Sequence, residues 1–207
     1  FAASSPDSRS DSDNGEYLAG VRRILNSQHK FDNFKRAPSY NRVLEHVSRD
    51  HGQDYLKILE RRSDGLLQIA QKGVLIEDKI GNPRKFTYAG YPEPLSPTTL
   101  RYVKVASDLN MLFGSELGHT AEIGCGYGGQ ALVNDRLLNV KSALLFDLPD
   151  VNRLVNRYLN CFVLEGAALT TCLNYEMPRD YDLVVSNYAF SELPKAVQLS
   201  YLDKVLT

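Results

Sequence analysis

Cysteine is scarce in this sequence and its charge is nearly balanced, and both facts exclude whole classes of protein. The 207 residues include three cysteines, Cys125, Cys161 and Cys172, an odd number without paired spacing. We therefore expect no disulfide framework. We expect a reducing, cytoplasmic setting instead. The formal net charge is −1, so no global field draws the chain toward nucleic acid or an anionic membrane surface.

Long apolar runs and metal-ligand spacings are also missing. No stretch approaches the ~20 apolar residues of a membrane-spanning helix. His46 and His51 lack the carboxylate pattern of a zinc helix, so we expect both at the surface and expect no metal site. Residues 1–14 are rich in Ser and Asp and lack the apolar stretch of a signal peptide. They are predicted to form a disordered lead-in.

Helical patterns dominate the first half of the chain. Between Glu16 and Lys72 apolar residues recur at helical spacing, and one such stripe begins with Val43, Leu44 and Val47. Residues 73–95 are rich in Gly and Pro and are predicted to form loops. We therefore expect residues 15–117 to be a helical cap.

The last helix of this cap has clear start and stop signals. Ser96 can cap it, Pro97 suits its first position, and Gly114 can end it. Within the cap, residues 73–102 are predicted to fold over a ligand as a lid. Arg101 and Tyr102 are then candidate ligand contacts, although a solvated helix face would explain Arg101 almost as well.

After Gly118 the pattern changes to short apolar strands that alternate with helices. Strands are expected at 119–123, 142–147, 167–173 and 181–186, and helices at 129–138 and 150–160. This alternation predicts parallel βαβ units with right-handed crossovers. Residues 118–207 are therefore predicted to form an α/β domain with a Rossmann-like sheet.

The most informative segment is EIGCGYGG at residues 122–129. The strand ends at Ile123, and Gly124, Gly126 and Gly128 follow before the next helix. Glycine is needed where the backbone bends sharply and approaches a ligand without a Cβ atom between them. The loop also fits the G-x-G-x-x-G dinucleotide fingerprint, so the glycines alone do not decide between nucleotide cofactors. They could also form a tight turn that binds nothing.

Two carboxylates favour a cationic cofactor. Glu122 directly precedes the loop, where it would repel a pyrophosphate and attract the ammonium and sulfonium groups of S-adenosylmethionine (SAM). Asp147 follows the next strand, where it could accept hydrogen bonds from both ribose hydroxyls. The alternatives are an ion-paired strand residue at Glu122 and a turn residue or helix cap at Asp147.

The same residues resemble a known class of enzymes. EIGCGYGG resembles the first motif of class I SAM-dependent methyltransferases, and FDLPDV at 146–151 resembles the second-strand segment of small-molecule O-methyltransferases. The wider pattern is similar to the bacterial sugar O-methyltransferase family; it comprises KIGNP at 79–83, SPTTLRY at 96–102, EIGCGYGGQ at 122–130, FDLPDVNRLVNRYL at 146–159 and DLVVSNYAFSELP at 182–194.

This resemblance implies roles for individual residues. Glu122, Gly124, Gly126 and Gly128 would hold the methionine side of SAM, Asp147 would bind the ribose, and Leu148 would contact the adenine. The residue for the adenine amino group is left open among Thr171, Asn174 and Glu176. Cys125 lacks a neighbouring His or Lys to activate it and is expected to be a small filler.

The loop after the fourth strand is predicted to face the methyl acceptor, because ligands bind beyond the carboxyl ends of parallel strands. Its candidates are Glu192 as the general base and Asn187 as the residue that orients the acceptor or cofactor. Glu192 could instead cap or ion-pair within the following helix. Tyr188 and Phe190 are expected to pack rather than bind.

The sequence thus predicts a SAM-dependent O-methyltransferase for a sugar or another hydroxylated small molecule, with S-adenosylhomocysteine (SAH) as product. An NAD-linked oxidoreductase and a non-catalytic SAM-binding or assembly module are the alternatives, and a homo-oligomer is left open. Since the chain ends at Thr207, we expect a class I sheet truncated after its fourth strand. A chain that lacks the last strands could bind SAM poorly. We therefore expect activity of the full-length protein more than of this chain alone.

Overall fold

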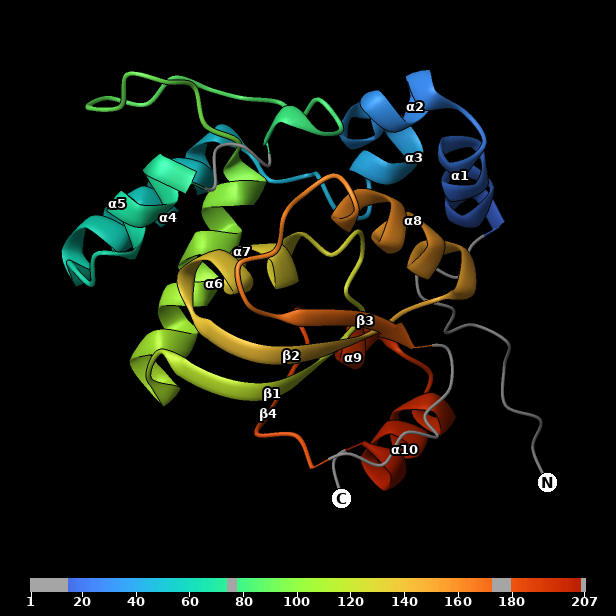
Figure 1. The fold of residues 1–207 in the computed structure, drawn as a ribbon. Helices are drawn as coiled ribbons and strands as arrows, with labels where there is room; N and C mark the ends of the chain where they lie inside the picture. The colour runs from blue at the N-terminus through green and yellow to red at the C-terminus, as the bar shows by residue number, and fades with distance from the viewer. Residues whose placement is uncertain (1–14, 74–77, 173–179, 206–207) are drawn as a thin grey trace, which may run out of the picture.

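A four-stranded sheet organises the second half of the chain (Figure 1). The computed structural model describes residues 15–73, 78–172 and 180–205, so the lead-in predicted at 1–14 lies outside the described residues. The strands are β1 (Glu116–Ile123), β2 (Asn139–Phe146), β3 (Ala168–Cys172) and β4 (Leu183–Val185). They pair in the order β3-β2-β1-β4, and every pairing is parallel. The predicted parallel, Rossmann-like sheet is confirmed.

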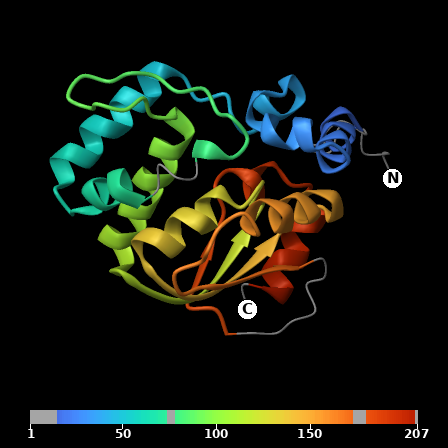
Figure 2. The same cartoon turned by 45° about the horizontal axis from the view of Figure 1, so that its top comes forward.

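Helices cover both faces of this sheet (Figures 1 and 2). On one face α7 (Gly129–Leu137) follows β1 and α8 (Pro149–Leu159) follows β2, while α10 (Lys195–Lys204) lies on the other, after the short α9 (Ala189–Glu192). Strand alternation separates the two cores: Leu145 packs on the α7–α8 side and Phe146 against Tyr201 of α10.

The N-terminal region is helical, as predicted. Its elements are α1 (Gly15–Leu25), α2 (Gln28–Asp32), the 3₁₀ turn η2 (Phe34–Arg36), α3 (Pro38–Asn41), α4 (Arg49–Arg62), α5 (Leu66–Gly73) and α6 (Pro97–Phe113). The Ser96 hydroxyl accepts a hydrogen bond from the Thr99 N–H, and Gly114 follows at φ 80°. The predicted start and end of α6 are therefore confirmed.

The helical stripe predicted from Val43 is wrong. The chain turns after α3, and α4 begins only at Arg49, where the Ser48 hydroxyl accepts from the His51 N–H. The Asn41 side chain donates to the carbonyl of Glu45 at 3.1 Å, a local bond that closes a turn in place of a helix. Residues 42–48 therefore form a connecting segment, which we name the strap.

The cap and the sheet share one hydrophobic core. Buried residues from Tyr17 to Ala167 form a single cluster that includes residues of both regions. At the surface Arg157 of α8 donates to the carbonyls of Ile24 and Leu25 at the end of α1, at 3.2 and 2.7 Å. These bonds tie carbonyl groups at the end of α1 to α8, and the Ile24 carbonyl also accepts from the Ser27 N–H at 3.4 Å. The cap is thus fixed beside α8, near the carboxyl ends of the strands.

Candidate functional site

The glycine loop at the end of β1 has the conformation that its sequence demands. Gly124, Gly126 and Gly128 have φ values of 74°, 58° and 86°, all in the left-handed region that other residues avoid. The Gly124 N–H donates to the carbonyl of Phe146 at 2.8 Å, which ties the loop to the end of β2. The loop then enters α7 at Gly129.

Glu122 and Asp147 lie side by side at this end of the sheet. Glu122 is paired in register with Leu145, two residues before Asp147, so strand alternation puts both carboxyl groups on the α7–α8 side. The Asp147 carboxylate accepts from the Gly126 N–H at 2.9 Å and from the Leu148 N–H at 2.8 Å. The two predicted acidic residues therefore belong to one site, with the glycine loop between them.

Both carboxyl groups are held in conditions that disfavour their charge. Burial, and secondarily the charge of Asp147, raises the pKa of Glu122 to about 8. Burial also raises the pKa of Asp147 to about 6, although the N–H groups of Leu148 and Gly126 oppose the shift. A cationic ligand between the two groups would stabilise their ionised forms, whereas an anionic ligand would raise both pKa values further.

Protein atoms approach the loop closely from two directions. A Cβ on Gly124 would overlap with Ala189 of α9, and one on Gly126 would lie 3.0 Å from the Leu44 side chain in the strap. The loop after β4 is anchored beside β1, because the Ser186 hydroxyl donates to the Ile123 carbonyl at 2.9 Å and accepts from Phe190 N–H. Glycine is thus needed here for packing as well as for backbone conformation.

The two predicted acceptor-side residues have different surroundings. Asn187, at the end of β4, is half-buried, and its side-chain nitrogen is enclosed without a hydrogen-bond partner among the described residues. Glu192 is the last residue of α9 and is exposed. The packing predicted for Tyr188 is wrong, because its side chain is 71% exposed, with φ 74°. Asn187 therefore has an unused donor beside the glycine loop, and Glu192 reaches solvent.

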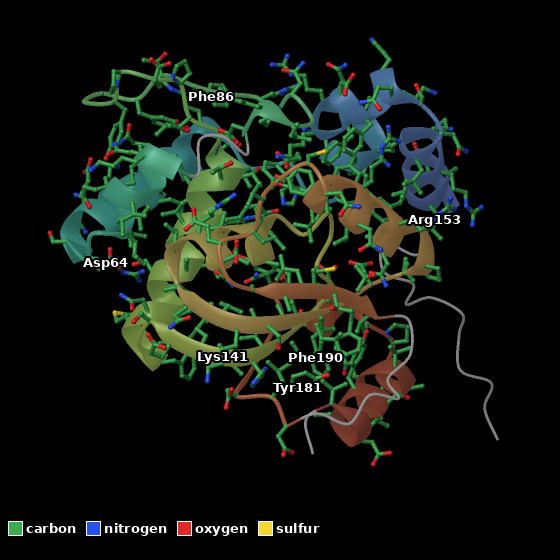
Figure 3. The ribbon with its side chains drawn as sticks, viewed as in Figure 1. Asp64, Phe86, Lys141, Arg153, Tyr181 and Phe190 are labelled. Atoms are coloured by element: carbon green, nitrogen blue, oxygen red, sulfur yellow. The ribbon has the colours of Figure 1, made fainter. Side chains whose placement is uncertain are left out.

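Phe190 packs, as predicted. It lies on the α10 side of the sheet with Tyr181, as Figure 3 shows, and its ring is 6.4 Å from that of Tyr201. Of the predicted adenine contacts, Leu148 is half-buried against the main core, and the Thr171 hydroxyl accepts from the Asn156 amide at 3.1 Å. Asn174 and Glu176 lie outside the described residues, so the choice among the three stays open.

A buried cluster between the cap and the loop was not predicted. The Lys35 ammonium, 2% exposed, lies 4.7 Å from the ring centre of Tyr127 in the glycine loop, and Glu45 in the strap is 8% exposed. Arg101 stacks on Tyr102 at 5.2 Å and donates to the carbonyl of Leu44. No sequence signal joins these residues, because they come from separate cap elements and meet only through tertiary packing.

The space beside Glu122 is small. A cavity of about 10 Å³ is lined by Glu122, Thr120, Ala131, Asn134 and Val185, among others, which is room for at most one water molecule. Within the described ranges, no group of His, Cys, Asp and Glu side chains could hold a metal, and no helix is long and apolar enough to cross a membrane.

The fold and the site define an α/β protein with a Rossmann-like parallel sheet and a glycine loop at the carboxyl end of its first strand. Comparison of the chain with family models and with curated proteins finds no match. The case for a particular chemistry therefore depends on the residues of this site.

Proposed function

We propose that this chain is a SAM-dependent O-methyltransferase that acts on a sugar or another hydroxylated small molecule. The observation that supports it best is the pairing of Glu122 and Asp147 on one face, on either side of a left-handed glycine loop. A negative site at a sheet's carboxyl end suits a cationic nucleotide cofactor, and ligands of open α/β sheets bind at this end.

The residues present fit SAM. Burial and the charge of Asp147 raise the pKa of Glu122, and a cationic ammonium or sulfonium group beside it would relieve both effects. Each Asp147 oxygen accepts one N–H bond and keeps a lone pair for a ribose hydroxyl. When bound, SAM supplies a methyl group on a positively charged sulfur.

The chain's own task in such a reaction is to position the acceptor and to remove its proton. The unused amide donor of Asn187 can orient the acceptor oxygen beside the loop. A carboxylate must take the hydroxyl proton, and Glu192 is the residue predicted from the sequence for that role. Leu44 and Tyr127 help to enclose the loop, which would keep water from the reacting atoms.

The rival cofactor, NAD, would share Asp147 as its ribose ligand but would bring a pyrophosphate to the loop. Two negative phosphates close to Glu122 would hold it in its neutral form, without attraction, whereas the cationic groups of SAM would favour its ionised form. This contrast in charge is the physical reason for preferring SAM.

Isothermal titration calorimetry of the chain with SAM, SAH and NAD tests the proposal. We expect SAM and SAH to bind at the same site, each competing with the other, and NAD to give no heat of binding. Tight NAD binding with no response to SAM or SAH would instead support the oxidoreductase. Binding of SAM combined with unchanged methyl transfer in both Asn187→Ala and Glu192→Gln would contradict the acceptor-side assignment and leave the cofactor site intact.

A further inference from the structure

Glu45 is a buried acid with an unused oxygen. Its side chain is 8% exposed, and Oε1 has no hydrogen-bond partner within the described residues. Buried polar atoms are almost always hydrogen-bonded, and leaving a charged one unpaired costs on the order of 1–3 kcal/mol or more. In the folded chain this oxygen can therefore accept a hydrogen bond from a bound ligand.

The position of Glu45 connects this oxygen to the cofactor site. Glu45 directly follows Leu44, whose side chain lies over Gly126. The hydroxyl of Tyr127, the next residue of the loop, is close enough to Glu45 to act on its ionisation. The strap therefore places the Glu45 carboxyl within reach of Tyr127 in the glycine loop.

The groups around Glu45 come from every element packed against it, and most are cationic or hydroxylated. The titratable and charged ones are Lys35 of η2, Arg101 and Tyr102 of α6, Tyr40 of α3 and Tyr127 of the glycine loop, and Thr98 adds a hydroxyl. Burial raises the pKa of Glu45, and Lys35, Thr98, Tyr127 and Arg101 oppose that shift. A carboxylate with a raised pKa is a stronger base than one in water.

We propose that Glu45, rather than the exposed Glu192, is the general base of the reaction and binds the acceptor hydroxyl through Oε1. The proposal rests on the proposed function. The acceptor oxygen forms a bond to the methyl carbon as the carbon–sulfur bond breaks and its electron pair stays on sulfur. The hydroxyl proton passes to Glu45 and is released to solvent after the methylated product leaves. Charge balances, because the cationic sulfur becomes neutral and one proton is released.

The test compares Glu45→Gln with Glu116→Gln, a matched control at an exposed glutamate at the start of β1, away from the glycine loop. It uses methyl-tritiated SAM and three probes: the methyl α-glycosides of glucose, galactose and mannose. Glu45→Gln should lower kcat/KM by about 10²- to 10⁴-fold, the usual contribution of a general base, and leave SAM affinity unchanged. It should also abolish the rise of kcat/KM with pH. Glu116→Gln should stay within about threefold of the unmodified chain in all three measurements.

A readout independent of turnover uses the unmodified chain with ¹³C-labelled glutamate carboxyls, in which the Glu45 signal is the one missing from Glu45→Gln. In the SAH-bound protein this signal should shift when one of the glycosides is added, and the Glu192 signal should not. No shift with any of the three, or full activity of Glu45→Gln, would overturn the role of Glu45. Failure of SAM and SAH to bind would instead overturn the proposed function, and the base assignment with it.

Discussion

The backbone N–H of Gly126 donates a hydrogen bond of 2.9 Å to Oδ2 of Asp147, and the other oxygen of that carboxylate accepts from the N–H of Leu148. One side chain thus fixes the glycine loop after β1 to the segment that follows β2. The same carboxylate is the predicted ribose ligand, so the group that shapes the loop also binds the cofactor. A substitution here acts on both.

Asp147→Ala should weaken SAM binding by roughly 1.5–3 kcal/mol, the scale of hydrogen bonds to a charged group. Calorimetry with SAM measures the change. Asp150→Asn is the matched control, since it removes an ion pair with Arg22 at the start of α8 and leaves the loop alone. An unaltered affinity in Asp147→Ala would mean that the ribose binds elsewhere.

The pKa of Glu122 makes folding stability depend on pH. Between its ordinary value of 4.5 and the folded value of about 8, the folded chain holds a proton there that the unfolded chain does not. The free energy of unfolding should therefore fall as pH rises through this window, by up to about 1.4 kcal/mol per unit. Asp147, raised from 3.8 to about 6, adds a change of the same sign below pH 6.

Glu122→Gln removes the pH dependence that Glu122 gives to the free energy of unfolding. The stability of this variant relative to the unmodified chain should therefore increase from pH 5 to pH 8. Urea unfolding at both pH values measures this difference. A constant difference between the two proteins over that range would show that Glu122 is ionised in the folded chain without penalty.

Gly124→Ala should disrupt the site for two separable reasons. Its φ of 74° disfavours any other residue, and its new Cβ would overlap with Ala189. Gly90→Ala is the control, because Gly90 has φ 84° and open space around it. The control should lose about 1–2 kcal/mol of stability from the backbone alone. Thermal unfolding should show a larger loss in Gly124→Ala, with loss of SAM binding; equal losses would mean that α9 moves aside freely.

Arg157→Met should detach the end of α1 from α8. The guanidinium donates to the carbonyls of Ile24 and Leu25 and lies 4.2 Å from the Phe31 ring centre, so we expect a loss of about 1–3 kcal/mol in urea unfolding. Arg153→Met, on the same helix, serves as control. Arg153 is 68% exposed, makes one weak ion pair and points away from the protein (Figure 3), so about 0.5 kcal/mol or less is expected. Similar losses in both variants would contradict this role of Arg157.

Much of the sheet was predictable because its signals are local. The glycine loop, the Ser96 cap and the alternation of apolar strands with helices each depend on residues close together in the sequence, and each is found where predicted. Glu122 and Asp147 could be joined because parallel strands end at the same edge of a sheet.

The strap and the buried cluster could not be predicted in the same way. Leu44 fits a helical stripe, and only the bond from Asn41 to the Glu45 carbonyl shows that the chain turns instead. Lys35 would ordinarily be assigned to the surface, since a lysine is rarely buried without partners. Its burial depends on the rings of Tyr127 and Tyr158, which are distant in the sequence and close only in the folded chain.

We propose that Glu122 and Asp147 together bind the positively charged sulfur of SAM. The number of protons released on SAM binding tests this most directly. Calorimetry with SAM at pH 7.5, in two buffers of different ionisation enthalpy, counts the protons released. Because the pKa of Glu122 is about 8, SAM binding should release a proton from it, and Glu122→Gln should release fewer and bind more weakly. Equal proton release and equal affinity in the two proteins would contradict the account.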